Sequence, residues 1–345
     1  MQRTSPFIDP ASVEAWDNWF RWRERGRLRD LDVEATWRRV VDALTASPRA
    51  STPAAAELFE ACASWRLLLD ERILAGAGTP EACWPDDGLV ALINVPVFVR
   101  GRFGADAAID RASLAQTARL AVTALDAAAD TAVPGGARSR SLRIGLTGMA
   151  DALALLGLGY GSEAGRRQAA EVARVLAQAG LEAGVRLACD RGADGGDPAL
   201  PLERARLRGW PAELVRDLAR YGVRYAALTA ITAQPHLALL ANNVSDGLDP
   251  LPDEHPPRRG AAVAHVTVSG GYALNLRRAL AAPPPAAFAT RAELPPDAPL
   301  AMRAAVQPWI DATIADPLAP PTPAGAAESE PMRVRPARRP LIEST

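Results

Sequence analysis

Few side chains in this sequence can act as nucleophiles, radical carriers or proton-transfer groups. The 345 residues include three cysteines and three histidines, and every one of the 39 basic residues is an arginine. Without a lysine, the chain can form no Schiff base and has no Walker-type phosphate-binding lysine. Candidate chemistry therefore centres on six residues: Cys62, Cys83, Cys189, His236, His255 and His265.

The cysteines are too few and too widely spaced for a disulfide framework or a CxxC zinc site. Cys62 and Cys189 fall in the apolar patterns of predicted helices, so we interpret both as core residues. Cys83 lies beside Trp84 in a predicted loop and is the candidate catalytic cysteine. No Arg or His within two residues would lower its pKa, so an unreactive thiol is the alternative.

The histidines do not share one element. His236 follows a Gln-Pro turn and is a candidate hydrogen-bond donor to a phosphate, with a capping or exposed role as the alternative. His255 belongs to a predicted surface loop, and His265 to a β-prone stretch over residues 262–269. No two histidines stand three or four residues apart, so we expect no metal site.

The elements that would position these residues follow from apolar periodicity. Amphipathic patterns predict helices over residues 9–25, 32–45, 53–69, 111–129, 162–190 and 298–314. Apolar runs over residues 72–79 and 89–99 predict buried strands, and residues 225–241 read as a strand, a turn at Gln234-Pro235 and a further apolar element. Strands that alternate with long helices predict an α/β architecture.

Composition suggests three parts: an N-terminal helical region over residues 1–70, an α/β domain over 71–316, and a flexible Pro- and Arg-rich tail over 317–345. The net charge of −1 gives no field to attract phosphate polymers or anionic lipid, so we expect neither nucleic acid nor membrane as a partner. The sequence has no long apolar span and no secretory h-region, which predicts a cytoplasmic protein.

Five segments, in order, resemble the large catalytic chain of ribonucleotide reductase, most closely its adenosylcobalamin-dependent class. The first two are ILAGAGT (73–79) and INVPVFVRGRF (93–103), the latter followed by Leu125-Asp126 and Asp130, where the family has its INL strand and LDNxxD helix. The third, GLTGMAD through LGLGYGS (145–162), is similar to GLADAL-LLGLPYxS. The fourth runs from YGVR through VSDGLDP (221–250), where the family has YGxRN, PTGT and SxGIEP. The fifth, MRAAVQPWID (302–311), is similar to AAVQxxVD.

The resemblance implies a ten-stranded α/β barrel. Here the first two segments lie a short loop apart, where the family has several strands, so we expect a partial, helix-rich barrel with a small open sheet. The strand ending near Ala77 and the strand 89–95 would be neighbours, packed by the helices 111–129 and 162–190. An open sheet edge needs a cover, so we expect a homodimer or a full-length reductase partner, with Trp16, Trp19 and Trp22 as candidate interface residues.

The family reaction requires a thiyl radical, a dithiol pair, a carboxylate and a phosphate-binding loop. The radical motif NxCxE falls on residues 79–88, where Pro85 replaces the glutamate that should follow Cys83, and Gly88 replaces one thiol of the pair. PTGT becomes residues 233–236, where Pro235 removes a backbone donor. The family's SKT becomes residues 315–317. Thr232, Gln234 and His236 remain as candidate nucleotide-binding residues.

These departures favour a ribonucleotide-reductase-like protein that has lost catalysis and acts as a binding or regulatory relative, with a nucleotide as its ligand. A second hypothesis is a compact ribonucleoside-diphosphate reductase that uses adenosylcobalamin, the cofactor implied by the resemblance, to make deoxyribonucleotides. A third is a different enzyme in which Cys83 or His236 has a new role. Reduction of a ribonucleotide in the presence of a thiol reductant would distinguish the second hypothesis from the first.

Overall fold

A computed structural model describes residues 7–46, 52–82, 84, 88–131, 142–194, 196–252, 271–279 and 286–315. These residues belong to one compact unit, Met1–Ala315, and the second unit, Asp316–Thr345, lies outside the described part. Our expectations for Cys83, His255, His265, the β-prone stretch 262–269 and the tail 317–345 fall outside the described residues. The three-part domain division stays a prediction.

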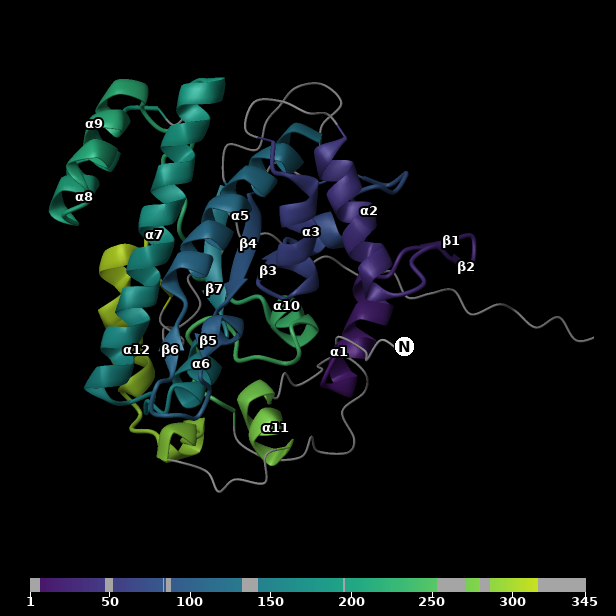
Figure 1. Cartoon of the computed structure of the whole chain (residues 1–345), viewed down its shortest axis with the longest axis vertical. Coiled ribbons are helices and arrows are strands. Elements are labelled where there is room, and N and C mark those ends of the chain that lie inside the picture. Colours follow the sequence, from purple (N-terminus) through teal and green to yellow (C-terminus); the bar gives the residue numbers. More distant parts are fainter. Residues whose placement is uncertain are drawn as a thin grey trace, which may run out of the picture. The chain divides into compact units, whose positions relative to one another are not determined.

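The described part is rich in helices, with short strands between them (Figure 1). The N-terminal third contains α1 (Pro10–Ala15), the π-helix η1 (Trp16–Phe20), β1 (Arg23–Glu24), β2 (Arg27–Leu28), α2 (Val33–Thr45), α3 (Ala55–Ala63), β3 (Leu67–Leu69), α4 (Glu71–Gly76), β4 (Leu89–Asn94), the 3-10 helix η2 (Val95–Phe98), β5 (Val99–Arg100) and β6 (Ala108–Ile109). The remainder contains α5 (Arg111–Thr131), β7 (Leu142–Thr147), α6 (Met149–Leu155), α7 (Glu163–Arg191), α8 (Ala199–Leu207), α9 (Ala212–Tyr221), α10 (Pro235–Leu240), α11 (Tyr272–Ala279), α12 (Ala298–Val306) and three 3-10 helices, η3 (Ala286–Phe288), η4 (Arg291–Glu293) and η5 (Gln307–Trp309).

A three-stranded sheet of order β3-β4-β7 is the centre of the fold. β3 runs antiparallel to β4, whereas β4 and β7 are parallel, with Leu89 opposite Leu142 and Asn94 opposite Thr147. The outer edge of β7 is partly paired, because Ile144 bonds to the extended segment around Thr229. The described residues therefore form small open sheets and an α/β fold, as expected, and they show no closed barrel.

The long helices α5 and α7 pack against each other and against the sheet, which confirms their predicted place. Asp110 begins α5 by accepting a hydrogen bond from the Ser113 N–H at 3.1 Å. Ser162 caps α7 by accepting from the Gly165 N–H at 2.9 Å, and the helix ends at Gly192, whose φ is 89°. Long periodic patterns with clear caps made these helices predictable.

The helix predicted over 53–69 is helical only over Ala55–Ala63, and the strand predicted over 72–79 is wrong. The helix ends at Ala63, because Trp65 takes a left-handed φ of 60°, and the strand is instead Leu67–Leu69. Residues 71–76 form α4, which begins where the Asp70 carboxylate accepts the Arg72 N–H at 3.0 Å. The neighbour of β4 is therefore β3 rather than a strand ending near Ala77.

The helix predicted over 9–25 ends at Phe20, before β1, and the strand predicted over 89–99 is interrupted by η2. Three further expectations need correction. Residues 225–231 are extended but pair with the sheet only through Thr229, and the apolar element after the turn is the helix α10. The helix predicted over 298–314 is α-helical only to Val306. Cys189 is exposed rather than buried in the core, because it lies with Arg186 on the outer face of α7, whereas Leu187 and Ala188 face inward.

The N-terminal segment is bonded to residues more than two hundred positions later. The Ile8 N–H donates to Asn242 Oδ1 at 2.7 Å, and the Ser12 hydroxyl donates to the Leu239 carbonyl at 2.6 Å. Asp9 accepts hydrogen bonds from the side-chain amides of Asn243 and Asn275 at 3.0 and 3.2 Å. These bonds hold α1 against α10.

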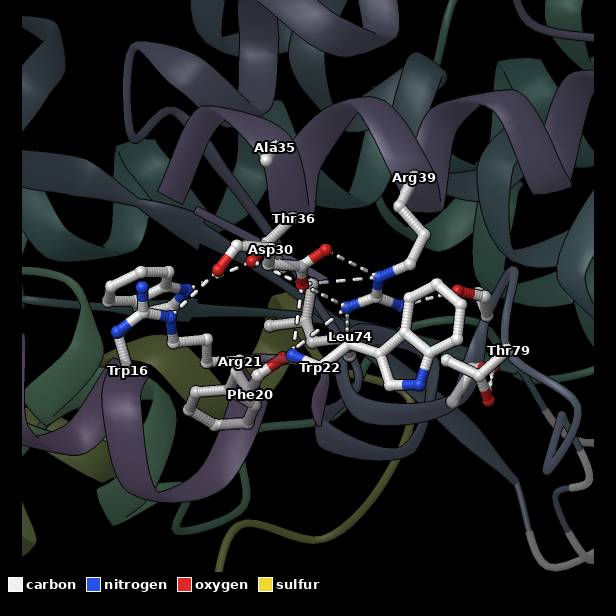
Figure 2. A network of polar contacts seen from close by, with 12 residues as sticks. Trp16, Phe20, Arg21, Trp22, Asp30, Ala35, Thr36, Arg39, Leu74 and Thr79 are labelled. Carbon is white, nitrogen blue, oxygen red and sulfur yellow. Dashed lines mark hydrogen bonds and ion pairs between the residues drawn. The ribbon is translucent and has the colours of Figure 1, made fainter. Parts of the chain in front are cut away.

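A second polar network joins η1, α2 and α4 (Figure 2). The buried Asp30 carboxylate accepts from the Trp22 N–H, the Thr36 hydroxyl and the Arg39 guanidinium, the last at 2.9 Å. Arg39 also donates to the carbonyls of Leu74, Ala77 and Phe20. The planar fork of an arginine suits such divergent acceptors, and the network fixes η1 relative to α4.

Candidate functional site

The carboxyl ends of the parallel strands form the candidate site. Asn94 ends β4 and pairs with Thr147, which ends β7. The segment next to β7 runs parallel to it, with Thr229 opposite Ile144. Thr232 lies three residues after Thr229, and Thr147 lies three residues after Ile144, so both reach the same edge of the sheet. In open α/β sheets, ligands bind in the crevice outside such carboxyl ends. The predicted nucleotide-binding residue Thr232 is thus brought to this edge, where its side chain is exposed.

A loop over residues 244–249, the edge loop, lies against the strand ends. The Ser245 carbonyl accepts hydrogen bonds from the Thr147 hydroxyl at 3.0 Å and from the Gly148 N–H at 2.7 Å. The chain reaches this position through two consecutive left-handed residues, Asn242 and Asn243, with φ of 65° and 60°. Asparagine is among the residues that adopt this conformation most readily.

Asp151 anchors the same loop from α6. Its two carboxylate oxygens accept from the Ser245 N–H at 2.6 Å and from the Ala273 N–H at 2.9 Å. Complete burial raises the pKa of Asp151 to about 6, although both backbone donors oppose that rise. Asp151 thus ties the edge loop and the start of α11 to the sheet.

The turn that should bind phosphate holds a carboxylate of the protein itself. The Gln234 N–H donates to both oxygens of Asp246, at 3.0 and 2.8 Å. Burial raises the pKa of Asp246 to about 6; the Gln234 N–H opposes this shift, and the charges of Asp249 and Glu71 add to it. Asp246 therefore occupies the anion position at the start of α10.

His236 faces α4 and η1 rather than an open site. Its Nδ1 lies 3.0 Å from Glu71 Oε2, and its ring centroid lies 4.1 Å from that of Trp19. The His236 side chain is 46% exposed, and its role as a nucleotide-binding or a capping residue stays a prediction. Of the three aromatic residues considered for an interface, Trp19 is half-buried against His236, Trp22 is half-buried, and Trp16 is 6% exposed and bonded to Thr36.

The two described thiols do not form a pair. Cys62 is completely buried on α3, and desolvation raises its pKa to about 12, so it stays protonated at neutral pH. Cys189 lies in the last turn of α7, where the adjacent Arg191 pairs with Asp126 and Asp130 near the end of α5. The indole of Trp84, which precedes β4, donates to the carbonyl of Ala128 near the end of α5. That end of α5 therefore faces the amino ends of the parallel strands β4 and β7.

Two family-like motifs meet in a buried ion network at that amino end. Arg224 Nε donates to Asp126 Oδ1 at 2.7 Å, and the same carboxylate accepts from Arg191 and from the Tyr225 hydroxyl. Arg224 also donates to the Gly192 carbonyl at 3.1 Å, at the end of α7. Asp126 and Arg224 therefore join α5, α7 and the segment after α9, which is a structural role.

Sequence reasoning missed a polar side chain that has no partner. Within the described part of the chain, Nδ2 and Oδ1 of Asn94 are buried without a hydrogen-bond partner, whereas the Ser245 side chain faces the Asp151 carboxylate and helps to lower its pKa. Asn94 is 1% exposed and Ser245 2% exposed. Both residues fall in segments that resemble the reductase family, but only the tertiary structure shows that the Asn94 side chain is unpaired.

Neither a metal site nor a membrane span is found among the described residues. No three His, Cys, Asp or Glu side chains there are arranged to hold a metal ion, and no described helix is long and apolar enough to cross a bilayer. In a comparison with protein families, the family described as "Ribonucleotide reductase, barrel domain" matches residues 89–318, about two thirds of the chain. A comparison with curated proteins gives no match.

Proposed function

Because the chain belongs to the ribonucleotide reductase large-chain family through its barrel domain, we propose that it is a member of that family that binds a ligand at the carboxyl ends of β4 and β7 without reducing it. The observation that carries this proposal is the state of the thiols. Reduction of a ribose needs a radical thiol and a dithiol pair at one place, and the chain has three cysteines in all. Cys62 is a buried thiol with a pKa of about 12, and Cys189 lies two residues before Arg191, which pairs with Asp126 at the amino end of the sheet.

The Asp246 carboxylate at the turn before α10 supports the same proposal. A phosphate at the turn before α10 would have to displace the Asp246 carboxylate from the Gln234 N–H. It would also lie near Glu71, a second negative charge, and like charges a few ångströms apart repel strongly in a partly buried site. The site is therefore poorly suited to a nucleoside diphosphate.

The residues of this edge also do not fit adenosylcobalamin chemistry. That cofactor supplies a radical to a cysteine, and neither described cysteine is a reactive thiol at the strand ends. No step of the proposed function uses the cofactor. In this proposal, the protein binds its ligand without reducing it and regulates a reductase partner.

The test is an assay for deoxyribonucleotide formation from all four ribonucleoside diphosphates, with adenosylcobalamin and a dithiol reductant. We expect no product from the purified protein. The variant Cys83→Ser tests the remaining cysteine, and Cys189→Ser is its matched control. Product formation that disappears in Cys83→Ser and persists in Cys189→Ser would refute the proposal and restore the working reductase.

A further inference from the structure

We propose that the hairpin formed by β1 and β2 is the docking surface for a partner protein that presents carboxylates beside apolar side chains. This rests on the proposed function in one respect, because a regulator must bind its partner, and it adds where the partner binds and by which groups. Neither the thiols nor the strand ends enter the argument. Three features of the hairpin carry it: unpaired arginines at its tip, a rigid base, and exposed leucines beside the charges.

The unpaired arginines give the hairpin its charge. Every second residue from 21 to 29 is an arginine. Three of these arginines form ion pairs with the carboxylates of Asp17 and Glu24. The other two, Arg25 and Arg27, lie at the tip, where they are exposed and form no ion pair with the described residues. The tip therefore presents two guanidinium groups that are free to bind carboxylates bidentately.

The base of the hairpin is rigid. Positive φ angles of 48° and 79° at Arg25 and the glycine after it form a two-residue turn that suits the twist of paired strands. The Arg29 N–H donates to the Trp22 carbonyl at 3.0 Å, and the Trp22 N–H donates to the buried Asp30 carboxylate at 3.1 Å. Figure 2 shows that carboxylate held by Arg39 of α2. A preformed surface loses little conformational freedom on binding, which favours association.

Exposed leucines lie beside the arginines. Leu28 is 43% exposed and lies opposite Arg23 in the hairpin, so the two side chains share a face. Leu31 is 74% exposed, and its carbonyl accepts a hydrogen bond from Arg21 at 3.0 Å. Removing such apolar surface from water stabilises a complex. Apolar area next to arginines is typical of protein interfaces.

This combination favours a protein over a nucleic acid as the partner. Asp17, Glu24 and the exposed Asp32 carry negative charge in the same region and would repel a phosphate backbone. A phosphate backbone also offers no apolar surface to Leu28 and Leu31. An acidic protein surface can supply both carboxylates for the arginines and apolar contacts for the leucines.

A second copy of the chain is the less suitable partner. A two-fold symmetric contact places a surface patch against itself. Hairpins in such a contact would bring Arg25 and Arg27 of both copies together, and these like charges repel. The partner is therefore a different protein with an acidic surface.

Fluorescence anisotropy with a labelled peptide of four Glu-Glu-Leu repeats, titrated with the full chain, tests the proposal. We expect binding that weakens at least about tenfold when salt rises from roughly 50 to roughly 300 mM. The same peptide with glutamine in place of glutamate should bind at least about tenfold more weakly. A single-stranded thymidine oligonucleotide of the same charge should also bind at least about tenfold more weakly.

Variants of the hairpin locate the binding surface. Arg25→Gln/Arg27→Gln should weaken peptide binding by about tenfold or more, because it removes the free charges at exposed positions. Leu31→Ser should weaken it by about threefold or more, because it removes an apolar contact. The matched control is Arg206→Gln/Arg216→Gln, at exposed positions of α8 and α9, which should leave binding unchanged.

Several outcomes would overturn the proposal. They are no peptide binding at millimolar concentration, an equal loss of binding in both double variants, and tighter binding of the oligonucleotide than of the peptide. Sedimentation equilibrium that shows a dimer of the wild type, lost in Arg25→Gln/Arg27→Gln, would replace the acidic partner by a second copy. None of these results touches ligand binding without reduction, which fails only if the protein forms deoxyribonucleotides.

Discussion

Asp246→Asn gives a direct test of how the internal carboxylate affects stability. Burial raises the pKa of Asp246 from 3.8 to about 6. The folded state thus binds this proton more tightly than the unfolded chain does. The stability that Asp246 contributes is fully present below pH 3.8 and is lost as the pH rises through about 6. A shift of about two units at 1.36 kcal/mol each corresponds to about 3 kcal/mol at most.

The asparagine variant does not titrate and still offers an oxygen to the Gln234 N–H. The difference in unfolding free energy, variant minus wild type, should therefore rise by up to about 3 kcal/mol between pH 4 and pH 7.5. Asp151, whose pKa is also raised to about 6, titrates in both proteins, so its contribution cancels.

Urea denaturation followed by tryptophan fluorescence at several pH values measures this difference. Asp197→Asn is the control, because Asp197 also accepts a backbone N–H, from Ala199 at 2.9 Å, but is exposed. The control should show no comparable pH dependence. A constant difference for Asp246→Asn across pH 4–7.5, or a loss of stability that grows with pH, would refute the reasoning. A constant difference would mean that folding does not shift the pKa of Asp246, and a loss that grows with pH would mean that the turn before α10 stabilises the carboxylate anion.

Three further predictions concern the fold. Arg224→Leu should lower the unfolding free energy by about 3 kcal/mol, measured by urea denaturation, because it leaves the buried Asp126 carboxylate undercompensated. Gly148→Ala should lower the unfolding free energy by more than about 2 kcal/mol in the same measurement, because φ is 75° and the new Cβ would lie 2.5 Å from Pro96. Its control is Gly157→Ala, at φ 72° with no atom within 4 Å of the new Cβ, which should cost only the backbone strain of about 1 kcal/mol. A chain ending at residue 317 should keep its thermal midpoint in calorimetry, since residues 318–345 have little apolar surface to bury, and a large drop would contradict this.

The long helices and the sheet strands differed in how well they could be predicted. α2, α5 and α7 combine sustained periodicity with clear capping residues, so their bounds follow closely from the sequence. In residues 53–79, α3 has no side-chain cap, and the capping residue of α4, Asp70, directly follows an apolar run. Three leucines in a row fit a helix or a strand equally well, and the left-handed Trp65 that separates α3 from β3 has no local signature.

The candidate site was predicted only in part. The turn predicted at Gln234-Pro235 is present and directly precedes α10. Its occupant could not be foreseen, because Asp246 is twelve positions away and its carboxylate reaches Gln234 only through the path of the edge loop. Likewise, Glu71 and His236 meet across 165 positions, and an unpaired Asn94 is a property of all its neighbours together.

The attachment of the N-terminal segment has a consequence for how the protein is made. Ile8, Asp9 and Ser12 find their partners between residues 239 and 275. At roughly 5–20 residues per second, a ribosome needs on the order of 10–50 seconds to deliver those partners after α1 has been synthesised. During that interval, the face of α1 that will cover α10 has nothing to pack against. The Ser12 hydroxyl and the Asp9 carboxylate, which are buried in the folded protein, therefore stay hydrated until residues 239–275 have been synthesised, and α1 can dock only after that point.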